Sequence, residues 1–153
     1  MFMPCTLVLL LLSHGAGGIN GGTAAHRDDG GGGGTDDDMA SLLDFKRAIT
    51  NDPSGAMSSW SWNTTAAAAA AAHFCGWKGV TCDGERRRVA ALDLAGHTLS
   101  GRISASLGNM SRLASLNLSS NLLSGPLPPQ LGSLRELVVL DLGGNSLQGI
   151  TIS

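Results

Sequence analysis

The C-terminal half of the chain repeats one pattern of apolar and polar positions at a fixed offset of 24 residues. In each copy, two leucines flank one variable residue, a polar residue follows three positions later, and then a leucine and a glycine. Side chains alternate along a strand, so the paired leucines predict a short strand with one buried face. The aligned columns are Leu92, Leu116 and Leu140; Leu94, Leu118 and Leu142; His97, Asn121 and Asn145; Leu99, Leu123 and Leu147; Gly101, Gly125 and Gly149; Leu107 and Leu131; and Leu113 and Leu137.

A period of this length with this spacing is typical of a leucine-rich repeat solenoid, in which stacked copies bury one continuous core. We therefore expect an α/β leucine-rich repeat solenoid, a short right-handed horseshoe segment with about two and a half repeats over residues 89–153. The Asn column should satisfy backbone groups at each turn and stack as a ladder. Pro126, Pro128 and Pro129 exclude a regular helix on the return segment, which we expect to be irregular or 3₁₀. The alternative, a run of leucine-rich helices, conflicts with the repeated Gly and Pro.

The N-terminal segment has the composition of a targeting signal followed by a linker. The apolar run at 7–12, followed by small residues, predicts a secretory signal peptide over residues 1–25, with cleavage near Gly15, Gly17 or Ala25. An ordinary disordered N-terminus is the alternative interpretation. Residues 26–36 are rich in Gly and Asp, and we expect them to be disordered. The apolar run is too short to span a bilayer, so no direct membrane insertion of this chain is expected.

Residues 37–88 have the pattern of a compact N-terminal cap. The three aspartates at 36–38 suit the N-terminus of a helix over 39–49, whose apolar face is formed by Leu42, Phe45 and Ile49. The seven alanines at 66–72 are expected to form a loop insert, with a short docked helix as the alternative. A module of this kind would cover the open first edge of the solenoid.

The cysteines predict one disulfide. Cys5 lies in the expected signal peptide, which leaves Cys75 and Cys82 in the mature chain. In a secreted protein, an even pair is most simply a disulfide. The alternative is a metal site formed by His73, Cys75, Cys82 and His97, although the spacing lacks a C-x-x-C pair. We expect no metal and no cofactor.

Other features concern the surface and the chemistry of the chain. The net charge of −2 argues against a nucleic-acid partner. Asn63, Asn109 and Asn117 begin N-x-Ser/Thr acceptor sequences for N-glycosylation. The outward strand positions form a candidate binding face of small side chains, and a solvated surface without a ligand is the alternative. These positions are Ala91, Asp93, Ala95, Ser115, Asn117, Ser119, Val139 and Asp141.

No catalytic motif accompanies the repeats. The Gly run at 30–34 is not followed by G-K-[ST], and neither a G-x-S-x-G sequence nor the H-R-D and D-F-G motifs of kinases occur. The competing class is an enzyme such as a Ser–His–Asp hydrolase, and we do not expect this chain to be one.

Several stretches resemble one family closely. Asp38 to Lys46 (D-M-A-S-L-L-D-F-K), residues 52–55, Cys75 to Cys82 and Arg88–Val89 are similar to the plant-type N-terminal cap of leucine-rich repeat receptors. Gly125 to Pro128 and residues 131–134 are similar to the plant-specific 24-residue repeat. The resemblance covers about residues 36–150. Departures are Trp-Ser-Trp at 60–62, the alanine run, and Ser104 where proline is usual.

The resemblance implies an extracellular recognition module of a plant receptor-like kinase or receptor-like protein. Its partner would be a protein or peptide ligand, including a co-receptor, and its location secreted, or plasma-membrane-associated as part of a longer receptor. Because the third repeat stops at residues 150–153, we expect a truncated form without the kinase domain that a full-length relative carries. The alternative is a small secreted protein, either co-receptor-like, a decoy, or an inhibitor of cell-wall-degrading enzymes.

Overall fold

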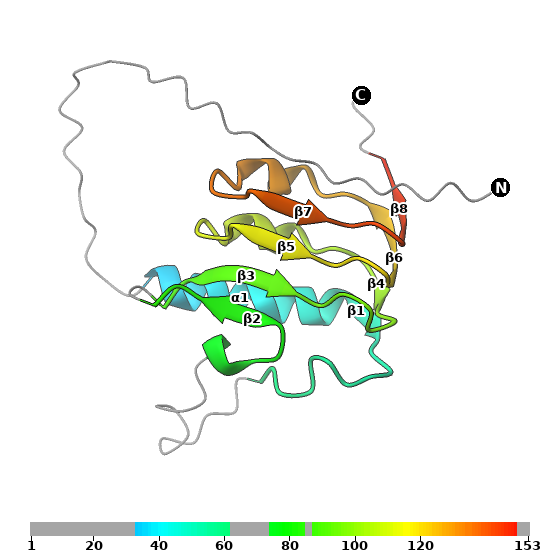
Figure 1. Cartoon of the computed structure of the whole chain (residues 1–153), viewed down its shortest axis with the longest axis horizontal. Coiled ribbons are helices and arrows are strands. Elements are labelled where there is room, and N and C mark those ends of the chain that lie inside the picture. The colour runs from blue at the N-terminus through cyan, green and yellow to red at the C-terminus, as the bar shows by residue number, and fades with distance from the viewer. Residues whose placement is uncertain (1–32, 62–73, 85–86, 150–153) are drawn as a thin grey trace.

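The computed structural model describes residues 33–61, 74–84 and 87–149. In this part of the chain, one helix and three 3₁₀ helices accompany two four-stranded sheets that run along the stack of repeats (Figure 1). The expected signal peptide, the alanine insert, Trp62, Asn63 and His73 lie outside the described residues.

The first sheet contains the strands predicted from the paired leucines. Its order is β2 (Val80–Cys82), β3 (Val89–Asp93), β5 (Ser115–Asn117) and β7 (Val139–Asp141). The last three strands are parallel, and their register follows the 24-residue period, with Leu92 opposite Leu116 and Leu116 opposite Leu140. The cap strand β2 pairs antiparallel with β3 and so completes the first edge of this sheet.

The second sheet was not expected. Its order is β1 (Ile49–Asn51), β4 (Ser100–Gly101), β6 (Leu122–Pro126) and β8 (Ser146–Gln148). We predicted an irregular or 3₁₀ return segment, whereas the L-S-G stretches pair in parallel as short strands. Their backbone groups find partners in the neighbouring repeat, and this pairing satisfies them without helix. The 3₁₀ prediction is correct for η2 (Ala105–Asn109) and η3 (Pro129–Ser133), which follow in each repeat.

The helix of the cap begins earlier than the sequence predicted. α1 spans Gly33–Ala48, so residues 33–36 are helical rather than disordered, and Ile49 belongs to β1 instead of the helix. The reason is a tertiary contact between the start of α1 and the first repeat. Asp38, in the early turns, is fully buried and accepts a hydrogen bond from the backbone N–H of Val89 at 2.9 Å. That contact holds the start of the helix against the first repeat.

One hydrophobic core continues from the cap into the repeats. Leu42 and Phe45 of α1 are fully buried together with Trp60, which stacks on Trp77 at a centroid distance of 5.5 Å. The inward leucines of the strands continue this core, from Leu92 and Leu116 to Leu140. The cap is therefore packed as the first layer of the stack, as the sequence predicted.

Candidate recognition surface

The outward side chains of the first sheet form a continuous face, which we call the strand face. Register places Ala91 beside Ser115 and Ser115 beside Val139, and likewise aligns Asp93, Asn117 and Asp141. The strand face consists of these six residues with Ala95 and Ser119, which are the eight positions predicted from the sequence. The structure therefore brings them together on one surface. Their role in binding stays a prediction.

Each member of the polar column is held by the turn that follows its strand. Oδ1 of Asp93 accepts a hydrogen bond from the Ala95 N–H at 3.1 Å, and Oδ1 of Asp141 accepts one from the Gly143 N–H at 3.0 Å. Oδ1 of Asn117 accepts from both the Ser119 N–H (3.1 Å) and the Ser119 hydroxyl (2.7 Å). These bonds fix the side chains before any partner arrives, so less conformational entropy is lost on binding.

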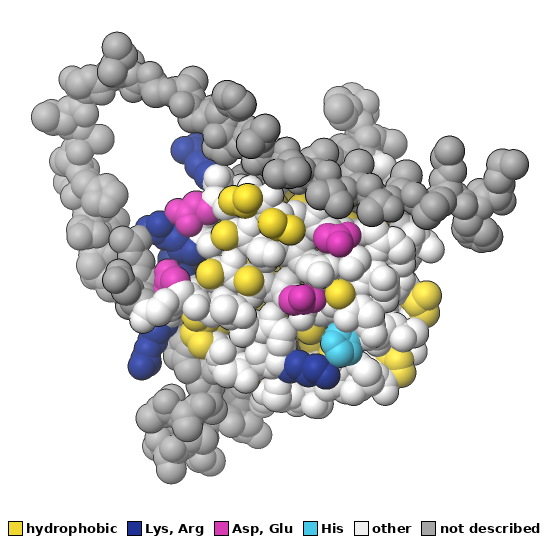
Figure 2. Space-filling view, viewed as in Figure 1, with side chains coloured by type: hydrophobic (Ala, Val, Ile, Leu, Met, Phe, Trp, Pro, Cys, Tyr) yellow, Lys and Arg dark blue, Asp and Glu magenta, His cyan; other side chains and the backbone are white. Residues whose placement is uncertain are grey.

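Apolar and acidic groups occupy different parts of this surface. Apolar side chains gather over the first halves of β5 and β7, and acidic side chains lie where β3 and β7 end (Figure 2). Val138 and Val139, at the start of β7, are large hydrophobic residues that are 55% and 46% exposed. The strand face carries no aromatic residue or arginine, and these are the usual energetic centres of interfaces. The face alone is therefore suited to shallow contact.

An internal Asn ladder positions the strand ends. Nδ2 of Asn121 donates to the carbonyls of Leu94 and Leu118, at 2.8 and 3.0 Å, and Oδ1 accepts from the N–H groups of His97 and Leu99, both at 3.0 Å. Asn145 repeats the pattern one repeat later, with Nδ2 donating to the Leu118 carbonyl at 2.8 Å. The predicted ladder is confirmed, and it ties each turn to the preceding one.

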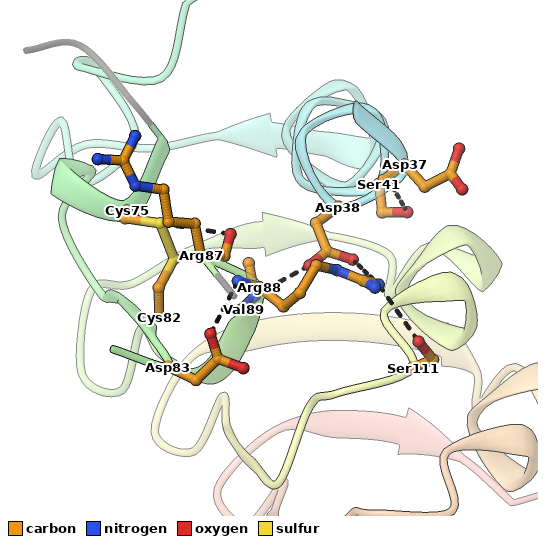
Figure 3. A network of polar contacts seen from close by, with 10 residues as sticks. All are labelled: Asp37, Asp38, Ser41, Cys75, Cys82, Asp83, Arg87, Arg88, Val89 and Ser111. Carbon is orange, nitrogen blue, oxygen red and sulfur yellow. Dashed lines mark hydrogen bonds and ion pairs between the residues drawn. A yellow bond between two sulfur atoms is a disulfide. The ribbon is translucent and has the colours of Figure 1, made fainter. Parts of the chain in front are cut away.

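A buried ion pair connects the cap to the first repeat, and sequence analysis missed it. Arg88 holds Asp38 with two hydrogen bonds, from Nε at 2.8 Å and from Nη2 at 2.9 Å, and Nη2 also donates to the Ser111 hydroxyl at 3.2 Å (Figure 3). The hydrogen bond to Asp38 raises the pKa of Arg88, which remains charged. Further along the same edge, Arg112 pairs with Glu136 at 2.8 Å. The offset of 24 residues between Arg112 and Glu136 was the one signal that could have predicted the second pair.

The predicted disulfide is present. Cys75 in η1 (Phe74–Gly76) is bonded to Cys82 in β2, with the Cα atoms 5.4 Å apart (Figure 3). This bond overturns the alternative metal site, because a disulfide removes both thiolates that the site required. In the described residues, no three His, Cys, Asp or Glu side chains are grouped as metal ligands.

The one Ser–His–Asp grouping that we find in the described chain is not arranged for nucleophilic catalysis. Ser54 Oγ lies 3.0 Å from Nδ1 of His97 and 3.3 Å from Oδ1 of Asp52. A catalytic set needs the histidine between serine and aspartate, whereas here the serine is in the middle. Asp52 also accepts hydrogen bonds from the N–H groups of Ala56 and Met57, both at 2.9 Å, which is the geometry of a structural turn.

Two of the three expected glycosylation sites lie in the described residues. Asn109 is exposed at the end of η2, and Asn117 is half-buried on the strand face. Glycosylation of these residues stays a prediction. The described chain contains no helix long and apolar enough to cross a membrane.

Comparison with known proteins identifies the family of both the cap and the repeats. Residues 35–83 match the leucine rich repeat N-terminal domain, and residues 112–134 match the Leucine Rich Repeat. The chain carries a plant-type leucine-rich repeat cap and repeats, homologous to those of plant receptor kinases. The module is 39% identical over 72 residues to the LRR receptor-like serine/threonine-protein kinase EFR of Arabidopsis thaliana, a match covering 46% of this chain and 6% of EFR. The chain thus spans a small fraction of this curated relative.

Several solved structures with the same fold belong to plant receptor kinases. The module superposes on the crystal structure of PEPR1–AtPEP1 with a TM-score of 0.64 at 33% identity, over 72% of this chain and 15% of that one. It superposes on the Arabidopsis receptor kinase HAESA, solved in complex with the peptide hormone IDA and the co-receptor SERK1, with a TM-score of 0.59 at 32% identity. That match covers 72% of this chain and 17% of HAESA. The predicted fold and family resemblance are therefore confirmed.

Proposed function

We infer that this leucine-rich repeat module recognises a protein or peptide outside the plant cell, as a ligand-binding or co-receptor-binding part of a receptor. The observation that carries the proposal is the strand face. Three parallel strands in register present an open surface whose polar side chains are already fixed by their own turns. Such a face suits an extended partner that crosses several repeats.

Comparison supports the same class. HAESA, which shares the fold, is solved with a peptide hormone and a co-receptor. The matched regions of this chain are the N-terminal domain and the repeat, which are recognition elements and not catalytic ones. We therefore assign the module no catalytic step of its own and place it at the cell surface or in the apoplast.

A binding experiment with a matched control tests this function. The chain is produced in the bacterial periplasm, so that its disulfide forms and no N-glycan is added. It is then immobilised and probed by surface plasmon resonance with the SERK1 ectodomain and with synthetic IDA peptide, the partners present in the HAESA complex. The test variant carries Asp93→Arg, Asn117→Arg and Asp141→Arg together. The control variant carries three arginines at exposed positions away from the strand face, Ser58→Arg, Ala105→Arg and Gln130→Arg.

We expect at least one probe to bind the unglycosylated chain and the control variant equally, with the strand-face variant binding at least tenfold more weakly. Equal binding by both variants would exclude the strand face as the contact surface. If neither probe binds, the assignment of this module to co-receptor and peptide recognition is contradicted.

A further inference from the structure

One acceptor sequence for N-glycosylation lies in the middle of the strand face. Asn117 is the last residue of β5, between Asp93 of β3 and Asp141 of β7 in the same column, and Leu118–Ser119 completes the acceptor sequence. A glycan on any asparagine is attached through Nδ2, so a glycan on Asn117 requires this nitrogen to be accessible from solvent.

The amide of Asn117 is oriented with its nitrogen available. Oδ1 accepts both bonds from Ser119, and Nδ2 donates no hydrogen bond to any described residue. No buried side-chain nitrogen or oxygen of the described chain lacks a partner, so Nδ2 of Asn117 reaches solvent. By contrast, Asn121, four residues later, is 4% exposed and uses both of its polar atoms within the ladder.

The side chains around Asn117 do not bond to its amide nitrogen. Its direct neighbours across the sheet are Asp93 of β3 and Asp141 of β7. Both carboxylates instead accept hydrogen bonds from their own turns, from the N–H groups of Ala95 and Gly143. The atom to which a glycan would be attached is therefore not bonded to its neighbours on the strand face.

We propose that Asn117 carries an N-linked glycan that covers the strand face and controls access to it. The proposal rests on the proposed function in requiring export through the secretory pathway. In the transfer, Nδ2 of Asn117 bonds to the anomeric carbon of the first N-acetylglucosamine of a lipid-linked oligosaccharide. The bond from that carbon to the lipid diphosphate breaks, the diphosphate leaves with the electron pair, and Nδ2 loses one proton.

The consequence concerns which partners can bind. A branched glycan at the centre of the polar column blocks an extended ligand from crossing β3, β5 and β7. Recognition by glycosylated chains would use the edges of the module, and chains lacking the glycan would expose the strand face. Occupancy of one site would thus determine the binding surface.

Glycopeptide mass spectrometry of the full chain exported from plant cells tests the modification. Enzymatic release of the glycan in heavy-oxygen water converts a modified Asn117 to labelled aspartate. Ser119→Ala should abolish the label at residue 117, whereas Ser119→Thr, which keeps the acceptor sequence and a hydroxyl, should retain it. The exposed Asn109 provides an internal report of export.

Labelling of an introduced cysteine tests the covering. Ser115→Cys on the strand face should react with a bulky polyethylene-glycol maleimide several-fold more slowly before glycan release than after it. Ser58→Cys in the cap should react equally in both cases. Modified Asn109 with unmodified Asn117 would overturn the proposal and leave the proposed function intact, as would equal Ser115→Cys rates with the glycan present. A chain that stays in the cell and lacks both glycans would overturn both.

Discussion

At the scale of single residues, Asn121 shows how one buried amide connects two repeats. Its side chain is 4% exposed and bonds to backbone groups of the first repeat and of its own turn. Asn145 occupies the same column but is half-buried, because it lies in the last repeat described. The two residues therefore differ in burial while sharing chemistry and position.

We expect Asn121→Ala to lower the free energy of unfolding by about 3 kcal/mol and Asn145→Ala by about 1 kcal/mol, since unsatisfied buried backbone groups cost more than exposed ones. Urea denaturation of the two variants, followed by circular dichroism, measures the difference. Equal losses would mean that the ladder is not the source of this stability.

The sequence predicted the Asn ladder and missed the Asp38–Arg88 pair for the same reason. The ladder residues recur at the repeat period, so their alignment is visible without a structure. Asp38 and Arg88 are 50 residues apart and occur once, with the cap between them. Nothing in the local pattern distinguishes Asp38 from its neighbours Asp36 and Asp37, and only the packing of α1 on the first repeat buries it. The eight strand-face positions were predictable because they depend on alternation alone.

At the scale of elements, the junction between β1 and β4 depends on one glycine. Gly101 has φ +130°, and a Cβ there would clash with the Ala48 carbonyl oxygen and lie 2.8 Å from Cα of Ile49. Gly125 is its equivalent in the next repeat, with φ +83°, and a Cβ there would meet only the flexible side chain of Arg102 at 3.3 Å. The same substitution therefore has different consequences at the two sites.

Gly101→Ala should destabilise the protein by about 3 kcal/mol, because it adds a backbone clash to an unfavourable φ. Gly125→Ala should cost about 1 kcal/mol from its φ alone. Both substitutions change the unfolded chain alike, so their difference reports the β1–β4 contact. Thermal denaturation of the pair measures it, and a larger loss for Gly125→Ala would refute this account.

The turn after β1 should make part of the stability dependent on pH. Burial acts to raise the pKa of Asp52, but hydrogen bonds from the Met57 and Ala56 N–H groups and the Ser54 hydroxyl, with the charge of His97, lower it below the ordinary 3.8. The pKa of Asp52 is therefore lower in the folded chain than in the unfolded chain. The stability that its carboxylate contributes is fully present above the pKa of the unfolded chain and is lost as the pH falls through the pKa of the folded chain.

The stability difference between the wild type and Asp52→Asn should therefore be constant above about pH 5 and shrink below 3.8. Chemical denaturation of both proteins at a series of pH values measures this difference. A difference that grows on acidification would have the wrong sign.

The second sheet was not predictable from the repeat pattern. Its strands pair Ser100 with Leu122 and Ser124 with Ser146, an offset of 22 residues instead of the 24 that aligns the sequence columns. Its strands also contain Gly and Pro, which are poor strand formers. The pairing arises from stacking of the repeats. The local sequence permits these strands but has no pattern that would predict them.

At the scale of the whole molecule, the cap and the repeats share one core, and this determines how the module unfolds. Buried residues run without interruption from Leu42 in α1 to Leu140 in β7. Trp60 and Trp77 are buried in the cap, and the third tryptophan, Trp62, falls between them in the sequence, so tryptophan fluorescence is used as the signal of the cap. Circular dichroism also reports on the strands of the repeats. The two signals can therefore show whether the parts unfold together.

Replacing Cys75 and Cys82 together by alanine should lower the stability of the whole module by about 2–3 kcal/mol, because the disulfide restricts the unfolded chain. With one continuous core, fluorescence and circular dichroism should shift by the same amount and keep coincident midpoints. Urea titrations of both proteins, with reduced wild type as a second comparison, measure this. If only the fluorescence midpoint moved, the cap would unfold separately from the repeats. The stabilising effect of the disulfide would then not be transmitted through β2 to the strands of the strand face.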